Sequence, residues 1–377
     1  MASQSPQVAL TPSLEGGWYT DQSVFDAEQR AIFARRWLCV ARASEIPRPG
    51  SYLTVTVAGE SVIVVRDADH HAAAFYNVCR HRGSRLLREH HGVCGPVIRC
   101  PYHAWAYGWD GALRAAPNLP DPQRDNWASL GLHAVAIEER YGCLWLNLAP
   151  QPQPFAQDTV RQLLDRMGSD ELVARWGLER LATGRQTVYE VAANWKLIVE
   201  NFSECYHCPS VHPELTSVLP EFKRRRGTLH EIGYGAAYGD GVGGFTVDGR
   251  AGLPPLAGLS DTETRRYYGL VLTPNVFLNL VDDHVILHWL QPIAPGVTRV
   301  TCVWLFDPDV LAAGYDIEPS VQLFHTTNLQ DFTVCEGCQL GAASRVYAQG
   351  GYLVPVEQQL QRFHDEVRAA VAADPGA

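Results

Sequence analysis

The stretch that decides the fold runs from Cys79 to His103 and reads CRHRGSRLLREHHGVCGPVIRCPYH. It opens with Cys79 and His81 and closes, 18 residues further on, with Cys100 and His103. Each pair joins a cysteine to a histidine, and both side chains are ligands that proteins use to hold zinc and iron–sulfur centres. Four unrelated core residues would not be expected at this spacing, so the stretch predicts a metal centre.

Two kinds of centre accept two cysteines and two histidines. One is a tetrahedral zinc ion; the other is a Rieske [2Fe–2S] cluster, in which two histidines replace two cysteines on one iron. The Cys-x-His spacing of the first pair is tighter than that of a zinc knuckle, and each loop can give one ligand to each iron. The flanking sequence is typical of strands. These features favour the Rieske cluster. Cys94 is the only further cysteine between the pairs, whereas respiratory-chain Rieske proteins carry one more in each loop.

The sequence around this stretch predicts two domains and an N-terminal arm. Runs of β-branched residues broken by Gly and Asp predict an all-β Rieske domain over residues 37–150. The segment APQPQP at Ala149–Pro154 is typical of a connector, so we place a boundary there. A second domain is expected over residues 151–377, with a helical arm over residues 1–36 that packs on it.

The second domain is expected to be an antiparallel sheet covered by helices, which makes the whole chain α+β. Its strands follow one another without alternating helices, the pattern that distinguishes α+β from α/β proteins. One amphipathic helix, capped by Ser23 or Asp26, is expected over residues 18–37. We expect further helices over residues 155–167, 195–206, 319–340 and 355–373, and strands over residues 269–280, 285–292 and 299–306.

Composition and charge argue against several classes of protein. A chain of 377 residues exceeds what one hydrophobic core usually serves, and its formal net charge of −10 argues against nucleic-acid binding. No apolar run approaches the roughly 18–20 residues that cross a bilayer, and the N-terminus lacks the features of a signal peptide. Ten cysteines in a chain of this length suit metal chemistry in a reducing compartment. We therefore expect a cytoplasmic protein with no membrane or nucleic-acid partner.

A second cluster of potential metal ligands lies in NWKLIVENFSECYHCPSVHPEL, residues Asn194–Leu215. His207 and His212 would lie roughly 140° apart on a continuous helix. Pro209 and Pro213 interrupt the helix, however, and let His212 fold back towards His207. Two histidines and a carboxylate form the facial triad of non-haem Fe(II) oxygenases, and zinc hydrolases use the same ligands. A one-electron carrier upstream favours iron that activates O2, because hydrolysis needs no electrons.

Three further side chains of this stretch have more than one interpretation. Glu204 precedes His207 by three residues and shares its helical face, so it is a candidate third ligand. Cys205 and Cys208 are interpreted as packing thiols beside the site. A cysteine–histidine nucleophile is the alternative, but it leaves the upstream cluster without a role.

The two stretches together resemble the large (α) subunit of the Rieske non-haem iron oxygenases. With YYGLVLTPNVFLNLVDDHVILHWL (267–290) and VWLFDPD (303–309), the chain is most similar to the branch of glycine-betaine and stachydrine demethylases and choline monooxygenase. The resemblance implies that Glu204 bridges to a cluster histidine of the adjacent subunit. Most relatives have Asp there, and Glu occurs in a subset that oxidises quaternary-ammonium substrates. The implied ligands are Cys79, His81, Cys100 and His103 for the [2Fe–2S] cluster, and His207, His212 and Asp331 (in TNLQDFTVCEGCQLG) for mononuclear Fe(II).

The resemblance further implies the terminal oxygenase component of a multicomponent system. Such a component uses O2 and takes electrons from a flavin/ferredoxin-type reductase that consumes NAD(P)H. The chain has no flavin or dinucleotide fingerprint of its own, which is consistent with a separate reductase. Electron transfer between subunits implies a homotrimer. The expected reaction is hydroxylation or N-demethylation of a small quaternary ammonium or N-methylated substrate.

An onium substrate would need aromatic side chains around its charged head. The first candidates are Tyr206, Phe277 and Trp289, followed by Tyr234, Tyr238 and Phe245. Two alternative functions stay open at this point. One is a ring or alkyl hydroxylase of an aromatic acid or secondary metabolite. The other, more distant, is a Rieske ferredoxin-like electron carrier, which would leave the mononuclear iron ligands without a role.

Overall fold

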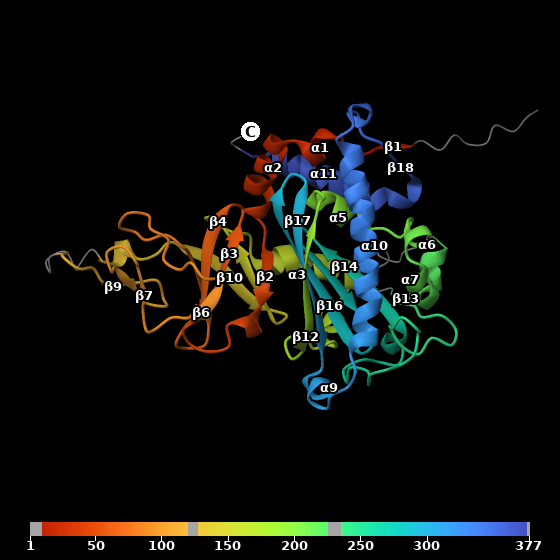
Figure 1. The fold of residues 1–377 in the computed structure, drawn as a ribbon, viewed down its shortest axis with the longest axis horizontal. Helices are drawn as coiled ribbons and strands as arrows, with labels where there is room; N and C mark the ends of the chain where they lie inside the picture. Colours follow the sequence, from red (N-terminus) through yellow and green to blue (C-terminus); the bar gives the residue numbers. More distant parts are fainter. Residues whose placement is uncertain (1–9, 120–126, 225–234, 375–377) are drawn as a thin grey trace, which may run out of the picture. The chain divides into compact units, whose positions relative to one another are not determined.

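A computed structural model of the protein describes residues 10–119, 127–224 and 235–374. The chain divides into two compact units, each of which can be followed along the sequence colours of Figure 1. The β unit comprises residues 33–158, and the mixed unit comprises residues 1–32 together with residues 159–377. In the described ranges, no helix combines the length and the apolar character that a membrane span requires.

The β unit contains two antiparallel sheets. The larger has seven strands in the order β2-β11-β10-β5-β4-β3-β6, and the smaller has three in the order β7-β8-β9. The strands are β2 (Leu38–Arg42), β3 (Ser51–Val57), β4 (Glu60–Arg66), β5 (Ala72–Tyr76), β6 (His91–Val93), β7 (Ile98–Arg99), β8 (Ala106–Tyr107), β9 (Leu113–Ala115), β10 (Ala134–Arg140) and β11 (Cys143–Asn147).

Two hairpins of the larger sheet close through turns of two residues. Ala58 and Gly59 join β3 to β4, and Tyr141 and Gly142 join β10 to β11; all four residues have positive φ. Turns with positive φ at both positions match the right-handed twist of the strands that they connect. Strand β5 pairs with β4 and with β10, so both hairpins hold the strand that the Cys79 loop follows.

The mixed unit combines a six-stranded antiparallel sheet, in the order β12-β17-β16-β15-β14-β13, with helices; β1 pairs separately with β18. The strands are β1 (Thr11–Pro12), β12 (Ala182–Val191), β13 (Ala236–Ala237), β14 (Arg266–Leu272), β15 (Val276–Leu280), β16 (His284–Ala294), β17 (Val297–Phe306) and β18 (Tyr352–Leu353). The helices are α1 (Gly17–Thr20), α2 (Gln22–Glu28), α3 (Phe155–Met167, which crosses the unit boundary), α4 (Asp170–Ala174), α5 (Trp195–Phe202), α6 (Cys208–Val211), α7 (Pro213–Val218), α8 (Pro220–Lys223), α9 (Pro308–Ala312), α10 (Glu318–Ala342) and α11 (Gln358–Ala372).

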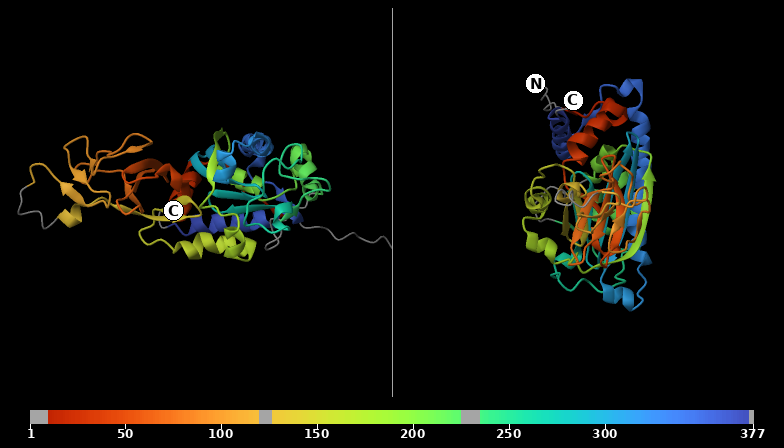
Figure 2. Two further views of the ribbon diagram at one scale, coloured as in Figure 1. Left: turned by 90° about the horizontal axis from the view of Figure 1, so that it is seen from below. Right: turned by 90° about the vertical axis from the view of Figure 1, so that its left-hand side faces the viewer.

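Helices α5 and α10 pack against each other and against the large sheet of the mixed unit. Helix α5 contacts β16, and α10 contacts β12. Figure 1 shows α10 running along the sheet, and the left view of Figure 2 shows it nearly end-on beside the strands. This packing brings segments that are more than a hundred residues apart in sequence, the end of α5 and the middle of α10, to one side of the sheet.

The α+β fold expected from the sequence is confirmed by these sheets and helices. The helix expected over residues 155–167 coincides with α3, and α10 extends the one expected over residues 319–340 by a few residues. The single helix expected over residues 18–37 is wrong. Asp21 has an extended backbone (φ −81°, ψ 129°), separates α1 from α2 and is the N-cap residue of α2 in place of Ser23 or Asp26.

Three more element boundaries differ from those expected. Residues 269–280 form two strands, β14 and β15, because Pro274 has no backbone N–H to donate in a ladder and lies in the turn between them. Helix α5 ends at Phe202, before Tyr206, and the hydroxyl of its C-cap Ser203 donates to the Val199 carbonyl at 2.6 Å. Strand β12 was not predicted, because its sequence ATGRQTVYEV contains no apolar run; half of its residues are exposed and only two are buried.

A fully buried ion pair joins the N-terminal segment of the mixed unit to α5. Lys196 Nζ lies 2.6 Å from Glu28 Oε1, and both side chains are 0% exposed. The indole N–H of Trp195 donates to Glu28 Oε2 at 2.8 Å, so both carboxylate oxygens are paired. Removing one member of such a pair leaves an uncompensated buried charge.

Glu28→Ala is therefore expected to lower the free energy of unfolding by about 3–5 kcal/mol. The double variant Glu28→Leu/Lys196→Met should recover most of this loss, because two apolar side chains of similar size need no charge partner. Urea unfolding of the single and double variants measures both quantities. A single variant within 1 kcal/mol of the parent, or a double variant as unstable as the single one, would contradict this account.

Candidate metal centres

Two loops of the β unit hold the Cys–His pairs. In the loop after β5, the Cys79 N–H donates to the Ser84 carbonyl at 2.8 Å and the Gly83 N–H donates to the Cys79 carbonyl at 3.0 Å. Gly83 has a φ of +71°, which favours glycine. In the loop after β7, the Cys100 N–H donates to the Trp105 carbonyl at 2.7 Å. Each pair is thus held in a closed turn of the backbone.

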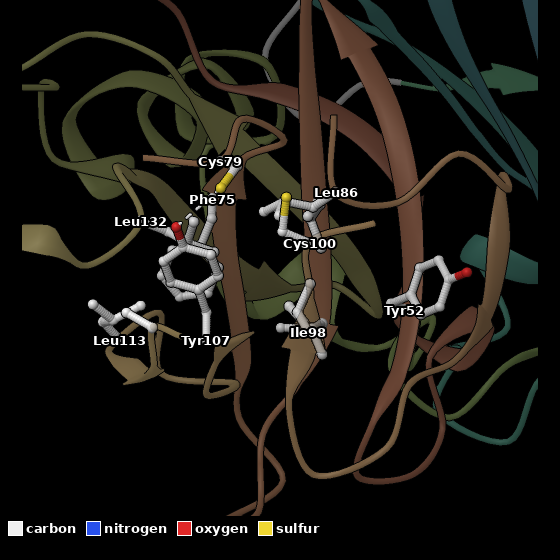
Figure 3. Packing of buried hydrophobic residues seen from close by; sticks show 12 residues of the cluster. Tyr52, Phe75, Cys79, Leu86, Ile98, Cys100, Tyr107, Leu113 and Leu132 are labelled. Carbon is white, nitrogen blue, oxygen red and sulfur yellow. Dashed lines mark hydrogen bonds between the residues drawn. The ribbon is translucent and has the colours of Figure 1, made fainter. Parts of the chain in front are cut away.

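Both cysteines belong to the hydrophobic core of the β unit, where Figure 3 shows Cys79 beside Tyr107 and Cys100 near Leu86 and Ile98. Their exposed fractions are 2% for Cys79 and 3% for Cys100. The hydroxyl of Tyr107 lies 3.3 Å from Cys79 Sγ and accepts the Arg80 N–H at 3.1 Å. Burial alone raises the pKa of Cys100, but the N–H groups of Tyr102 and His103 outweigh it and lower the pKa. The loop therefore favours a thiolate at Cys100.

The two imidazoles lie close together. The ring centroids of His81 and His103 are 4.6 Å apart, and His81 stacks on Trp105 with an angle of 8° between the planes. Nδ1 of His103 is buried without a hydrogen-bond partner. Buried polar nitrogens normally have a bonding partner, and a metal ion bound to Nδ1 would be that partner. Two buried thiols and two neighbouring imidazoles fit a Rieske [2Fe–2S] cluster.

A broken helix positions the two histidines of the mixed unit. His207 is the N-cap residue of α6, and His212 lies between α6 and α7 with a non-helical backbone (φ −121°, ψ 71°). Pro213 opens α7, and a proline disfavours the helical conformation in the residue before it. The break lets the rings of His207 and His212 approach to 5.2 Å between centroids. The expectation that an interrupted helix brings these two histidines together is met.

Asp331 of α10 completes a group of three donor atoms. Its Oδ1 lies 2.8 Å from Nε2 of His212 and 3.3 Å from Nε2 of His207. Donors bound about 2.1 Å from one ion at near right angles lie roughly 3 Å apart. The separations therefore fit a single metal ion held by two imidazoles and one carboxylate.

The outer nitrogen of each histidine has its own acceptor. Glu204 Oε1 lies 2.6 Å from Nδ1 of His207, and Gln330 Oε1 lies 2.8 Å from Nδ1 of His212. Acceptors at Nδ1 fix the tautomer that leaves Nε2 free to bind a metal. The other carboxylate oxygen of Glu204 accepts the backbone N–H of Tyr206. Glu204 thus lies on the far side of the His207 ring from Asp331, which argues against Glu204 as the third ligand.

Charge interactions in this group oppose the effect of burial. Burial lowers the pKa of His207, but hydrogen bonds with Asp331, Cys208 and Glu204 outweigh it and raise the pKa to about 12. Burial raises the pKa of Asp331, and the two histidines outweigh it and lower the pKa. A metal ion that binds here must displace the histidine protons, so its uptake is favoured as the pH rises.

An aromatic wall flanks the same region. Phe202, at the end of α5, stacks on Phe277 with 4.2 Å between centroids and 6° between planes. Phe277 pairs directly with His288 across β15 and β16, so these two side chains share a face of the sheet. His288 Nε2 lies 3.1 Å from Oδ1 of Asn328, which is one helical turn before Asp331 on α10. Burial lowers the pKa of His288 to about 4, so the ring is neutral at pH 7.

The aromatic residues expected to surround the substrate lie in different parts of the structure. Trp289 pairs with Val276 and points to the opposite face of the sheet from Phe277 and His288, so Phe277 and Trp289 cannot line one pocket. Tyr206 is 37% exposed. Of the further candidates, Tyr238 and Phe245 are buried, with the Tyr238 hydroxyl donating to Asp282, and Tyr234 lies outside the described residues. Phe202 was not among the candidates, although it lies in the stretch Asn194–Leu215 that contains His207 and His212.

Comparison with known families assigns both units. The Rieske [2Fe-2S] domain family matches residues 36–131. The catalytic domain of ring hydroxylating alpha subunits matches residues 178–373, which is more than half of the chain. The chain belongs to the Rieske ring-hydroxylating oxygenases.

This Rieske oxygenase is similar to several characterised relatives. It is 30% identical over 384 residues to the glycine betaine monooxygenase oxygenase subunit of Pseudomonas aeruginosa, with 94% of this chain and 87% of the relative covered. It is 38% identical over 209 residues to the carnitine monooxygenase oxygenase subunit of Escherichia coli, with 55% and 54% covered. A crystal structure of a quaternary ammonium Rieske monooxygenase with L-carnitine has a TM-score of 0.70 at 25% identity, and 97% of each chain is covered.

Family membership confirms the main assignments made from the sequence. The protein is a Rieske oxygenase, an oxidoreductase that uses O2, with a Rieske [2Fe–2S] domain and a catalytic domain of the kind that binds mononuclear iron. The match to the catalytic domain leaves the ferredoxin-like carrier without support.

Proposed function

We propose that the protein is the terminal oxygenase component of a system that hydroxylates or N-demethylates a small quaternary ammonium or N-methylated substrate. The proposed ligands are Cys79, His81, Cys100 and His103 for the [2Fe–2S] cluster and His207, His212 and Asp331 for the mononuclear iron. When bound, the iron supplies O2 activation and the cluster supplies electrons one at a time.

One observation carries the assignment of the iron site. Two Nε2 atoms and one carboxylate oxygen converge, while each Nδ1 is held by an acceptor of its own. This is the donor set of the 2-His-1-carboxylate triad, which leaves coordination positions open for O2 beside the substrate. Glu204 and Gln330 act as positioning residues, because they orient His207 and His212.

Glu204 is also the proposed bridge to a neighbouring subunit. Its carboxylate touches the iron-ligand ring of His207 and keeps 10% of its side chain exposed. A carboxylate in this position could accept a second N–H from His81 or His103 of an adjacent copy. We accordingly propose a homotrimer in which electrons pass between subunits. A flavin/ferredoxin-type reductase that uses NAD(P)H is the proposed electron donor, and the cytoplasmic location stays a prediction.

The substrate class rests on the relatives and on the aromatic wall. The relatives named above act on glycine betaine and carnitine, both of which carry a quaternary ammonium head. Phe202 and Phe277 stack on each other beside His288, which is hydrogen-bonded to Asn328 one helical turn before Asp331, and a ring face attracts an onium cation. Hydroxylation of an N-methyl group gives a hemiaminal, which breaks down to the demethylated amine and formaldehyde.

A small betaine or N-methylated amine is expected to stimulate NAD(P)H-coupled O2 uptake and to release formaldehyde. The measurement uses the purified protein, a surrogate reductase and a panel of betaines and aromatic acids, with products identified by mass spectrometry. Phe277→Leu should raise the KM for the onium substrate by about 2- to 30-fold, as expected for loss of one cation–π contact.

The matched control is the neutral analogue in which carbon replaces the onium nitrogen. Its affinity should change less in Phe277→Leu than the affinity for the onium substrate. Ring or alkyl hydroxylation of an aromatic acid, without formaldehyde, would replace this substrate assignment by the hydroxylase alternative and leave the oxygenase family unchanged.

A further inference from the structure

The mononuclear site contains a donor that the triad does not use. Cys208 Sγ lies 3.9 Å from Nε2 of His207. One donor atom from each of His207, Cys208 and His212 lies within 4.8 Å of the others. Cys208 is 2% exposed. Its thiol is therefore shielded from solvent and adjacent to both imidazoles.

The separations allow the thiol to reach the same ion as the triad. A nitrogen about 2.1 Å and a sulfur about 2.3 Å from one tetrahedral ion lie roughly 3.6 Å apart. The observed 3.9 Å between Cys208 Sγ and His207 Nε2 exceeds this by a few tenths of an ångström. Asp331 Oδ1 is already 2.8 Å and 3.3 Å from the two Nε2 atoms. A tetrahedral ion spaces two such donors roughly 3.4 Å apart, so a small rotation of the Cys208 side chain and a small widening of the Asp331–His212 contact would complete a set of four donors.

We propose that Cys208 is a fourth protein ligand of this site when a thiophilic divalent ion, such as Zn2+, occupies it. The inference rests on the proposed assignment of His207, His212 and Asp331 as the iron ligands. On binding, the thiol loses its proton to solvent and the thiolate coordinates the ion. Two imidazoles, one carboxylate and one thiolate are a complete tetrahedral set for zinc.

The consequence is a site whose metal preference depends on Cys208. Zinc binds nitrogen, oxygen and sulfur donors more tightly than Fe2+ does, and soft thiolate ligands increase that preference. A four-coordinate zinc ion would leave no open position for O2. Zinc therefore acts as an inhibitor that competes with Fe2+ for the site, and Cys208 sets the strength of that competition.

X-ray absorption at the zinc edge tests the proposal directly. The full-length protein keeps its [2Fe–2S] cluster, is freed of the mononuclear metal with a chelator and receives one equivalent of Zn2+. Because the cluster contains only iron, the zinc spectrum reports on this site alone. We expect one sulfur scatterer at about 2.3 Å in the parent and in Cys205→Ala, and none in Cys208→Ala. The zinc affinity of Cys208→Ala should fall by at least about 10-fold, the loss that even an outer-shell substitution causes.

Cys205→Ala is the matched control, because Cys205 is a buried thiol of the same segment that lies outside the group of three donors. A parent spectrum with nitrogen and oxygen scatterers only, or a sulfur signal that persists in Cys208→Ala, would overturn the proposal. Iron binding and turnover could depend on His207, His212 and Asp331 while the zinc spectrum shows no sulfur scatterer. In that case this inference fails and the proposed function stands. If zinc binds sulfur here and the protein shows no oxygenase activity, the proposed function fails.

Discussion

His207→Ala is expected to abolish product formation and to remove the mononuclear iron while the [2Fe–2S] cluster is retained. His207 supplies one of three donor atoms, and its Nε2 lies 3.3 Å from the carboxylate of Asp331. The proposed cluster ligands belong to the other unit of the chain, so their loops do not depend on this histidine. Iron content should fall from about three to about two ions per chain, and product formation should fall to undetectable levels. Iron analysis, the electron paramagnetic resonance signal of the reduced cluster and product assays measure the three quantities.

His81→Ala is the reciprocal control. It should eliminate the Rieske signal and stop turnover, whereas the affinity for one Fe2+ at the mononuclear site should be kept. Loss of the cluster spectrum in His207→Ala would show that the division into two independent centres is incorrect.

The second large effect is expected for Glu204→Gln, which should keep the mononuclear iron but reduce turnover by about 10- to 100-fold. The amide of glutamine retains the size of the side chain and an oxygen that can accept the Nδ1–H of His207. The amide lacks the negative charge of a carboxylate. That charge would hold two N–H donors at once, one from His207 and one from the neighbouring subunit. Reduction of the cluster by the reductase should proceed at the parent rate, and the subsequent oxidation of the cluster in the presence of substrate and O2 should be slow.

Asp331→Ala provides the contrast. It removes the third donor and should lose the mononuclear iron, so metal analysis of the two variants separates the roles of the two carboxylates. Product formation driven by hydrogen peroxide, which brings its own oxidising equivalents, should survive in Glu204→Gln and be lost in Asp331→Ala. A Glu204→Gln protein that purifies without mononuclear iron would instead make Glu204 the ligand.

The metal-ligand motifs could be predicted from the sequence because the residues of each pair are close together in the chain. Cys79 and His81 share one loop, as do Cys100 and His103, and a short loop determines the chemistry that it presents without reference to the rest of the fold. The prolines at positions 209 and 213 likewise predicted a broken helix, and the backbone of His212 is non-helical. By contrast, the helix expected over residues 18–37 failed at Asp21, where an extended residue interrupts an otherwise helical pattern.

The sequence by itself therefore determined the fold class and the oxygenase family, and it predicted the ligands of both centres. Tertiary structure decided which side chains share a site, because such contacts join residues that are far apart in sequence. Asp331 meets His207 and His212 because α10 packs against α5 and α7, whereas the contact between Glu204 and His207 is local. The pleat of the sheet directs Phe277 and Trp289 to opposite faces, which composition cannot reveal. The sulfur of Cys208 is a potential ligand for the same reason: its distance from the imidazoles is a property of the folded turn, and residue spacing does not specify it.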